Sequence, residues 1–82
     1  MNIEKKQRAS LVIVDDEQTI LTELEILLGR SYDVHTFINP EDVEGFIENN
    51  HVDLIICDEM MPEMRGSELL ERIHKTHPDI CK

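Results

Sequence analysis

Three short runs typical of strands, each followed by a helical pattern, constrain most strongly what this chain can fold into. The runs are the fully apolar "LVIV" at 11–14, the alternating "YDVHTF" at 32–37 and "VDLIIC" at 52–57. Apolar residues recur at helical spacing after each run, which predicts helices over 17–29, 40–49 and 67–77. Strands that alternate with helices form a parallel sheet covered by helices on both faces. The sequence therefore predicts a three-layer α/β fold of order βαβαβα.

Residues that favour helix ends mark the limits of the predicted helices. Gly29 is expected to end the first helix. Asn39 is expected to cap the second helix, with Pro40 in its first turn. Ser67 is expected to cap the third helix, and Pro78 to stop it. The predicted buried face of the first helix consists of Ile20, Leu21, Leu24, Leu27 and Leu28.

The size and charge of the chain exclude several classes of protein. Its 82 residues suffice for one small domain, assigned to residues 11–82, after a basic and solvated segment over 1–10. A net charge of −10 argues against nucleic acid as a partner, because phosphates repel such a surface. The two cysteines lack metal-site spacing, and no run is long enough to span a membrane. A reduced, cytoplasmic protein is therefore expected.

Acidic residues directly follow two of the predicted strands. Asp15 and Asp16 come after the first strand, and Asp58 comes after the third. If these strands are neighbours, the three carboxylates meet at one edge of the sheet and repel each other. A bound Mg²⁺ would relieve that repulsion, because this ion prefers oxygen ligands. The alternative is that the acids are solvated turn residues or helix caps.

Two motifs give the chain a resemblance to a known family. The motifs are "IVDDE" at 13–17 and "CDEMMPEMRG" at 57–66, followed by the helix "GSELLERI". Together they resemble the receiver domain of two-component response regulators. The resemblance covers residues 11–82, the first three βα units of a flavodoxin-like (βα)5 fold. It implies a partial (βα)3 unit with a parallel sheet of order 2-1-3.

The resemblance implies a role for each acid. Asp58 would be the phosphoacceptor, attacking a phosphohistidine on a sensor histidine kinase or a phosphotransfer protein. Asp16 would bind Mg²⁺ directly, Asp15 mainly through water, and Met60 through its backbone carbonyl. The chemistry is consistent, since a metal that bridges nucleophile and phosphoryl oxygen neutralises the incoming charge. Such a chain is a signalling module rather than an enzyme.

The loop after Asp58 carries further expectations. Met61 and Pro62 would steer the chain off the sheet, and Gly66 would supply backbone freedom before the third helix. Local packing is expected for Met60, Met61 and Met64. Glu59 stands where the family often has an apolar residue. Its negative charge would alter phosphorylation or hydrolysis, in a direction that the sequence leaves open.

Some family positions have no counterpart in these 82 residues. They are the Ser or Thr after a fourth strand and the Lys after a fifth, which contact the phosphoryl group. A slow phosphoacceptor reaction is therefore one expectation. The second is an interaction module with little phosphotransfer, in which the third strand, "DLIIC" at 53–57, exposes an open edge and pairs with its copy in a homodimer. An aspartate-nucleophile phosphatase is disfavoured, because neither strand end carries a DxD pattern.

Overall fold

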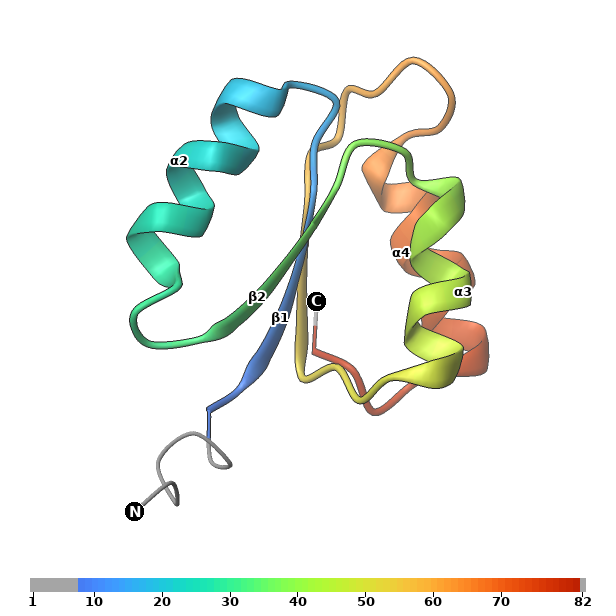
Figure 1. Ribbon diagram of the computed structural model, residues 1–82. Coiled ribbons are helices and arrows are strands. Elements are labelled where there is room, and N and C mark those ends of the chain that lie inside the picture. The colour runs from blue at the N-terminus through green and yellow to red at the C-terminus, as the bar shows by residue number, and fades with distance from the viewer. Residues whose placement is uncertain (1–7, 82) are drawn as a thin grey trace.

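A parallel sheet separates one helix from two others in the computed structural model, which describes residues 8–81 (Figure 1). The elements are β1 (Ser10–Val14), α2 (Gln18–Leu28), β2 (Asp33–Phe37), α3 (Glu41–Asn49), β3 (Leu54–Cys57) and α4 (Gly66–Thr76). Every boundary lies within two residues of the one predicted from the sequence. The predicted α/β class is confirmed.

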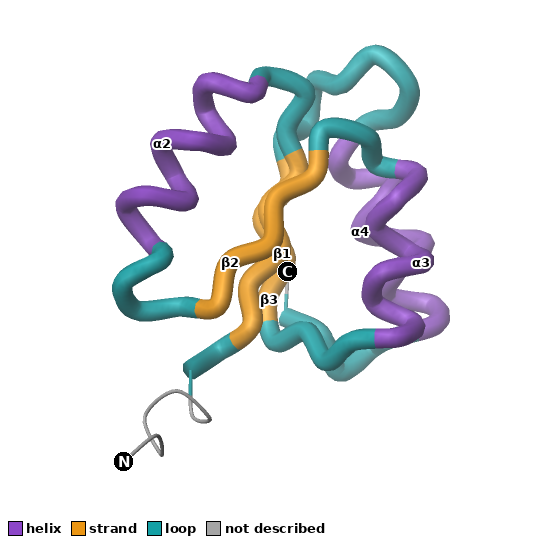
Figure 2. Tube along the Cα trace, in the orientation of Figure 1, coloured by secondary structure: helices purple, strands orange, loops and turns teal. Residues whose placement is uncertain are grey.

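The strand order is β2-β1-β3, with both neighbours parallel to β1 (Figure 2). Leu11 of β1 lies opposite Val34 on one side and Leu54 on the other. Because β2 and β3 flank β1, right-handed crossovers place α2 and α3 on opposite faces of the sheet. Helix α4 follows β3 and lies beside α3 (Figures 1 and 2). The predicted order is confirmed.

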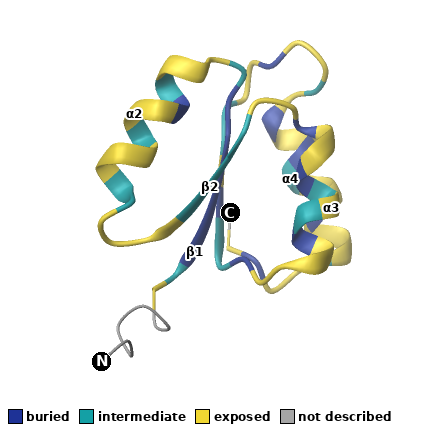
Figure 3. Cartoon of the chain, in the orientation of Figure 1, coloured by how far each residue is buried: buried dark blue, intermediate teal, exposed yellow. Residues whose placement is uncertain are grey.

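The buried residues form two cores, one on each side of the sheet. All five residues of β1 are buried (Figure 3). The side chains from Leu11 to Val14 alternate between the two cores. The larger core, under α3 and α4, consists of Val12, Val14, Val43, Ile47, Val52, Ile55, Met61, Leu69, Ile73 and Ile80. The smaller core, under α2, consists of Leu11, Ile13 and Leu21, with Leu24, Leu28, Val34 and Leu54 packed against it. The expectation for Leu27 is wrong: it is 70% exposed, because α2 turns that side toward solvent.

The helix ends match the sequence analysis in part. Gly29 is the C-cap of α2, with a right-handed φ of −65°. The Asn39 side-chain oxygen accepts a hydrogen bond from the Glu41 N–H at 3.0 Å, so Asn39 satisfies an amide at the start of α3. The expectation for Ser67 is wrong, since it is the second residue of α4 and Arg65 occupies the cap position without a side-chain cap bond.

The outer edge of β3 is partly covered. After α4 the chain returns to the sheet, and Cys81 forms a parallel bridge with Leu54. The Ile55 N–H donates to the Cys81 carbonyl at 2.9 Å, and the Cys81 N–H donates to the Asp53 carbonyl at 3.0 Å. Ile80 is buried in the larger core and anchors this return. The expectation that the whole edge is open is therefore wrong for its first half.

The N-terminal basic residues fall into two groups. Lys5 and Lys6 lie outside the described residues. Arg8 is held at the end of α2, where its guanidinium donates to the carbonyl oxygens of Arg30 at 2.9 Å and Gly29 at 3.4 Å. A cation at the carbonyl end of a helix is electrostatically favourable. Within residues 8–81, no helix has the length and hydropathy needed to cross a membrane.

Candidate functional site

The candidate site lies at the carboxyl ends of β1 and β3, where the strand order reverses. Asp15 and Asp16 directly follow β1, and Asp58 directly follows β3. One carboxylate oxygen from each of the three lies within 4.8 Å of the others. The structure thus brings together the three acids that the sequence placed at separate strand ends. In a doubly wound sheet this crevice is the usual place for a ligand.

Backbone hydrogen bonds hold the acids in place. The Asp15 N–H donates to the Phe37 carbonyl at 3.0 Å, and the Asp58 N–H donates to the Val14 carbonyl at 2.9 Å. Both bonds extend the sheet pairing by one residue. The Asp15 carboxylate also accepts the Glu17 N–H at 2.9 Å, and Asp15 is only 9% exposed. Asp15 and Asp58 are therefore held by hydrogen bonds that continue the sheet.

The Cys57 thiol lies beside this negative site. Burial is the largest cause, and together with the negative charges of Asp58, Glu59 and Asp15 it raises the pKa of Cys57 to about 11. The Cys57 Sγ lies 3.4 Å from the Asp58 carbonyl oxygen. The negative charges that contribute to this shift would attract a cation. Three carboxylates in such a region fit a hard divalent ion such as Mg²⁺, which takes oxygen ligands and keeps several waters.

The methionines after Asp58 differ in their surroundings. Met61 is 7% exposed and belongs to the larger core, and Met64 packs against that core. These two match the expected local packing. Met60 does not, because its side chain is 71% exposed. Its predicted role uses only the backbone carbonyl, and that role stays a prediction.

Gly66 is required for space rather than for backbone freedom. None of the glycines has a positive φ. A Cβ placed on Gly66 would lie 2.3 Å from the Asp58 carbonyl oxygen and 3.0 Å from the Glu59 Cα. The expectation that Gly66 is needed for backbone freedom is therefore wrong. Only a residue without a side chain lets α4 begin directly against the backbone of Asp58.

Glu59 makes contacts that sequence reasoning missed. Its carboxylate accepts the Ser67 N–H at 2.8 Å and the Ser67 hydroxyl at 3.1 Å, and lies 3.6 Å from the Arg65 guanidinium. The hydrogen bonds from Ser67 lower the pKa of Glu59, and Arg65 lowers it further. An acid eight residues before its partner matches no local capping pattern. The sequence signal was only that Glu59 departs from the apolar residue common in the family.

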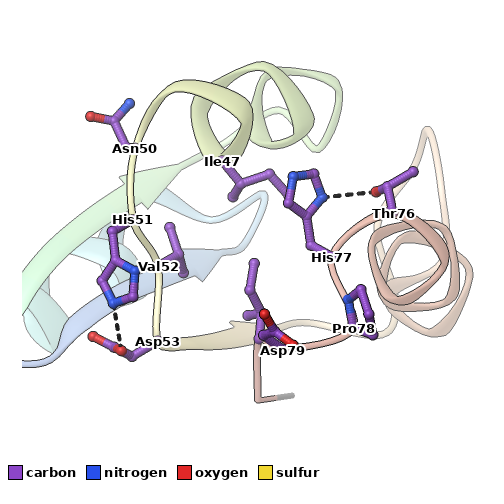
Figure 4. A pocket seen from close by; sticks show the side chains of 10 residues that line it. Ile47, Asn50, His51, Val52, Asp53, Thr76, His77, Pro78 and Asp79 are labelled. Atoms are coloured by element: carbon purple, nitrogen blue, oxygen red, sulfur yellow. Dashed lines mark hydrogen bonds and ion pairs between the residues drawn. The ribbon is translucent and has the colours of Figure 1, made fainter.

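A pocket of about 340 Å³ lies at the opposite end of the sheet (Figure 4). It is formed where α3 leads into β3 and where α4 ends. His51 contacts the Asp53 carboxylate there at 2.7 Å, and the His77 ring lies 2.8 Å from the Thr76 hydroxyl. None of the three clustered acids lines this pocket.

Comparison with known proteins identifies the family. The model of the response regulator receiver domain matches residues 11–81. The chain is 35% identical to the sensor kinase CckA of Brucella abortus over 88% of its own length and 8% of the kinase. It is 36% identical to the alkaline phosphatase synthesis transcriptional regulatory protein PhoP of Bacillus subtilis, over 79% of this chain and 28% of PhoP.

A solved structure agrees with these relatives. A CheY-like response regulator receiver domain protein from Methanospirillum hungatei superposes with a TM-score of 0.84 and is 32% identical. That match covers 90% of this chain and 60% of the other. The chain thus spans less than two thirds of each of these proteins. By sequence and by fold, it belongs to the response regulator receiver domain family of two-component signalling.

Proposed function

We propose that Asp58 accepts a phosphoryl group and that Asp15, Asp16, Asp58 and the Met60 carbonyl bind the Mg²⁺ that supports this reaction. The observation that carries the proposal is the clustering of the three carboxylates within 4.8 Å at the β1 and β3 ends. Among the described residues this is the one such group of potential metal ligands. A structural role alone gives no reason to collect three like charges there.

The proposed reaction is a simple displacement at phosphorus. An Asp58 carboxylate oxygen attacks the phosphorus of a phosphohistidine, the new O–P bond forms, and the P–N bond breaks. The electron pair of that bond returns to the imidazole, and the product is an aspartyl phosphate. A Mg²⁺ held by the three acids and the Met60 carbonyl would supply charge neutralisation for this attack. The rigid strand end contributes orientation, since Asp58 is fixed by its bond to Val14.

The proposed partner is a sensor histidine kinase or a phosphotransfer protein, with the reaction in the cytoplasm. Support comes from family membership and from the similarity to CckA, which is itself a sensor kinase. The net charge of −10 makes nucleic acid an unsuitable partner for this domain.

Acetyl phosphate and Mg²⁺ test the proposal directly. Mass spectrometry should find one added phosphoryl group on Asp58 in the wild type and none in Asp58→Asn. Equal modification of the wild type and Asp58→Asn would refute the assignment.

The second candidate function is assembly through β3. One observation favours it: the bridge to Cys81 reaches only the Leu54 end of the strand, and Ile56 remains 42% exposed. Pairing of two copies along the rest of this edge would be antiparallel about a two-fold axis. Sedimentation at micromolar concentration should then show a dimer. A stable folded monomer would exclude the shared sheet.

A further inference from the structure

Glu59 connects the loop over residues 58–65, the acceptor loop, to the start of α4. Its carboxylate accepts two hydrogen bonds from Ser67, at 2.8 Å from the N–H and at 3.1 Å from the hydroxyl. Its backbone carbonyl accepts the Gly66 N–H at 3.1 Å. The main chain and the side chain of one residue thus both bind the first residues of α4.

The Ser67 bonds carry this connection rather than the ion pair. Arg65 lies 3.6 Å from the carboxylate, and the two side chains are 70% and 48% exposed. Exposed pairs of this kind contribute little, because water screens them and ordering the side chains costs entropy. The Ser67 N–H is different, since it belongs to the first turn of a helix and has no partner within the helix.

The position of Glu59 gives these bonds a functional consequence. Glu59 stands between Asp58 and Met60, the two residues of the acceptor loop that the proposed function assigns to Mg²⁺. Any rotation of the Glu59 backbone would move the Asp58 carboxylate and the Met60 carbonyl relative to each other. Met61 and Met64 pack in or against the larger core, but Met60, Pro62 and Glu63 are exposed and give the loop no support near this point.

We infer that Glu59 is a positioning residue. Its hydrogen bonds to Ser67 hold the acceptor loop against the start of α4 and thereby fix the arrangement of Asp58 and Met60 that Mg²⁺ binding needs. The inference rests on the proposed function and deepens it. It also explains why an acid is compatible with this position beside the phosphoacceptor. Hydrogen bonds at the positive end of a helix balance the charge of Glu59, so the residue supports the site as well as adding to its negative field.

The test compares the Mg²⁺ affinity of Glu59→Ala with that of Glu63→Ala. Both variants remove one negative charge from the acceptor loop, but only Glu59→Ala removes the hydrogen bonds to Ser67. Calorimetric titration of the full chain with Mg²⁺, at neutral pH and fixed ionic strength, gives the dissociation constants. Glu59→Ala should weaken binding about 10-fold, as is common when an outer partner of a metal ligand is lost. Glu63→Ala should weaken it by less than about 2-fold, as a change in screened surface charge does.

Two further variants separate positioning from general stability. Glu59→Gln keeps an oxygen that can accept from Ser67, so its affinity should lie between those of the wild type and Glu59→Ala. It also carries the test if Glu59→Ala does not fold. Ser67→Ala removes the hydroxyl but keeps the N–H donor, and should fall in the same intermediate range. Circular dichroism at the titration temperature confirms that each variant is folded.

The possible failures are distinguishable. If the wild type binds Mg²⁺ and Glu59→Ala weakens binding no more than Glu63→Ala does, the positioning role of Glu59 is refuted and the proposed function stands. A lower melting temperature with unchanged Mg²⁺ affinity leads to the same conclusion, because it shows a structural role only. If the wild type itself does not bind Mg²⁺, both the proposed function and the positioning role of Glu59 are overturned.

Discussion

Replacing Gly66 by alanine should destabilise the protein, although alanine is the better helix former. Gly66 is the first residue of α4, and an added Cβ would lie 2.3 Å from the Asp58 carbonyl oxygen and 2.9 Å from the Asp58 carbonyl carbon. Both atoms belong to the backbone, so no side-chain rotation relieves the contact. The start of α4 must move until the separation reaches at least 3.0 Å.

The magnitude follows from two opposing effects. Overpacking of this kind costs about 1–3 kcal/mol. Replacing glycine by alanine in a helix interior stabilises the folded protein by about 0.5–1 kcal/mol, and this gain is smaller at a first helical position. The free energy of unfolding of Gly66→Ala should therefore fall by about 1–2 kcal/mol. In a domain of this size, that corresponds to a melting temperature lower by about 4–16 °C.

Gly45 is the matched control. It lies within α3, and a Cβ added there meets nothing within 4 Å. Gly45→Ala should stabilise by about 0.5–1 kcal/mol, because only the helix propensity changes. Thermal and urea unfolding, followed by circular dichroism, measure both variants. The reasoning is refuted if Gly66→Ala is as stable as the wild type, or if the two substitutions shift stability in the same direction.

Three further outcomes are expected. Mg²⁺ should raise the melting temperature of the wild type, and Asp16→Ala should abolish that increase; an unchanged response in the variant would contradict the metal assignment. In a Cys81→Ser background, Cys57 should react slowly with iodoacetamide at pH 8, because its pKa is raised to about 11. Asp58→Asn should lower that pKa and speed the reaction, and an equal rate would show that the acid does not act on the thiol. The pKa of Asp53 is lowered by a hydrogen bond from a β1 amide and by His51, so its charged form stabilises the fold above the pKa of the unfolded chain. This stabilisation should disappear as the pH falls through the lower, folded-state pKa, and urea unfolding of Asp53→Asn should show a weaker loss of stability in acid.

The sequence by itself determined the architecture and the acid site. The apolar run around Val12 reads as a strand buried on both faces, and β1 is buried throughout. Asp15, Asp16 and Asp58 each follow a strand directly. Parallel strands bring their carboxyl ends to one edge, so these positions define a shared site as soon as β1 and β3 are neighbours. Such features depend on the periodicity of apolar residues and on neighbours in the chain, and both can be read from the sequence.

Contacts between segments distant in the chain were decided only by the tertiary structure. Glu59 rather than Ser67 satisfies the first turn of α4, because the acceptor loop folds back and places an acid eight residues away against the helix. Cys81 covers part of the β3 edge because the chain returns to the sheet after α4. Gly66 is needed for space beside Asp58, although its position suggested a need for unusual backbone angles. Each outcome depends on separations of about 3 Å between atoms of different segments, and such separations are fixed only when the helices pack onto the sheet.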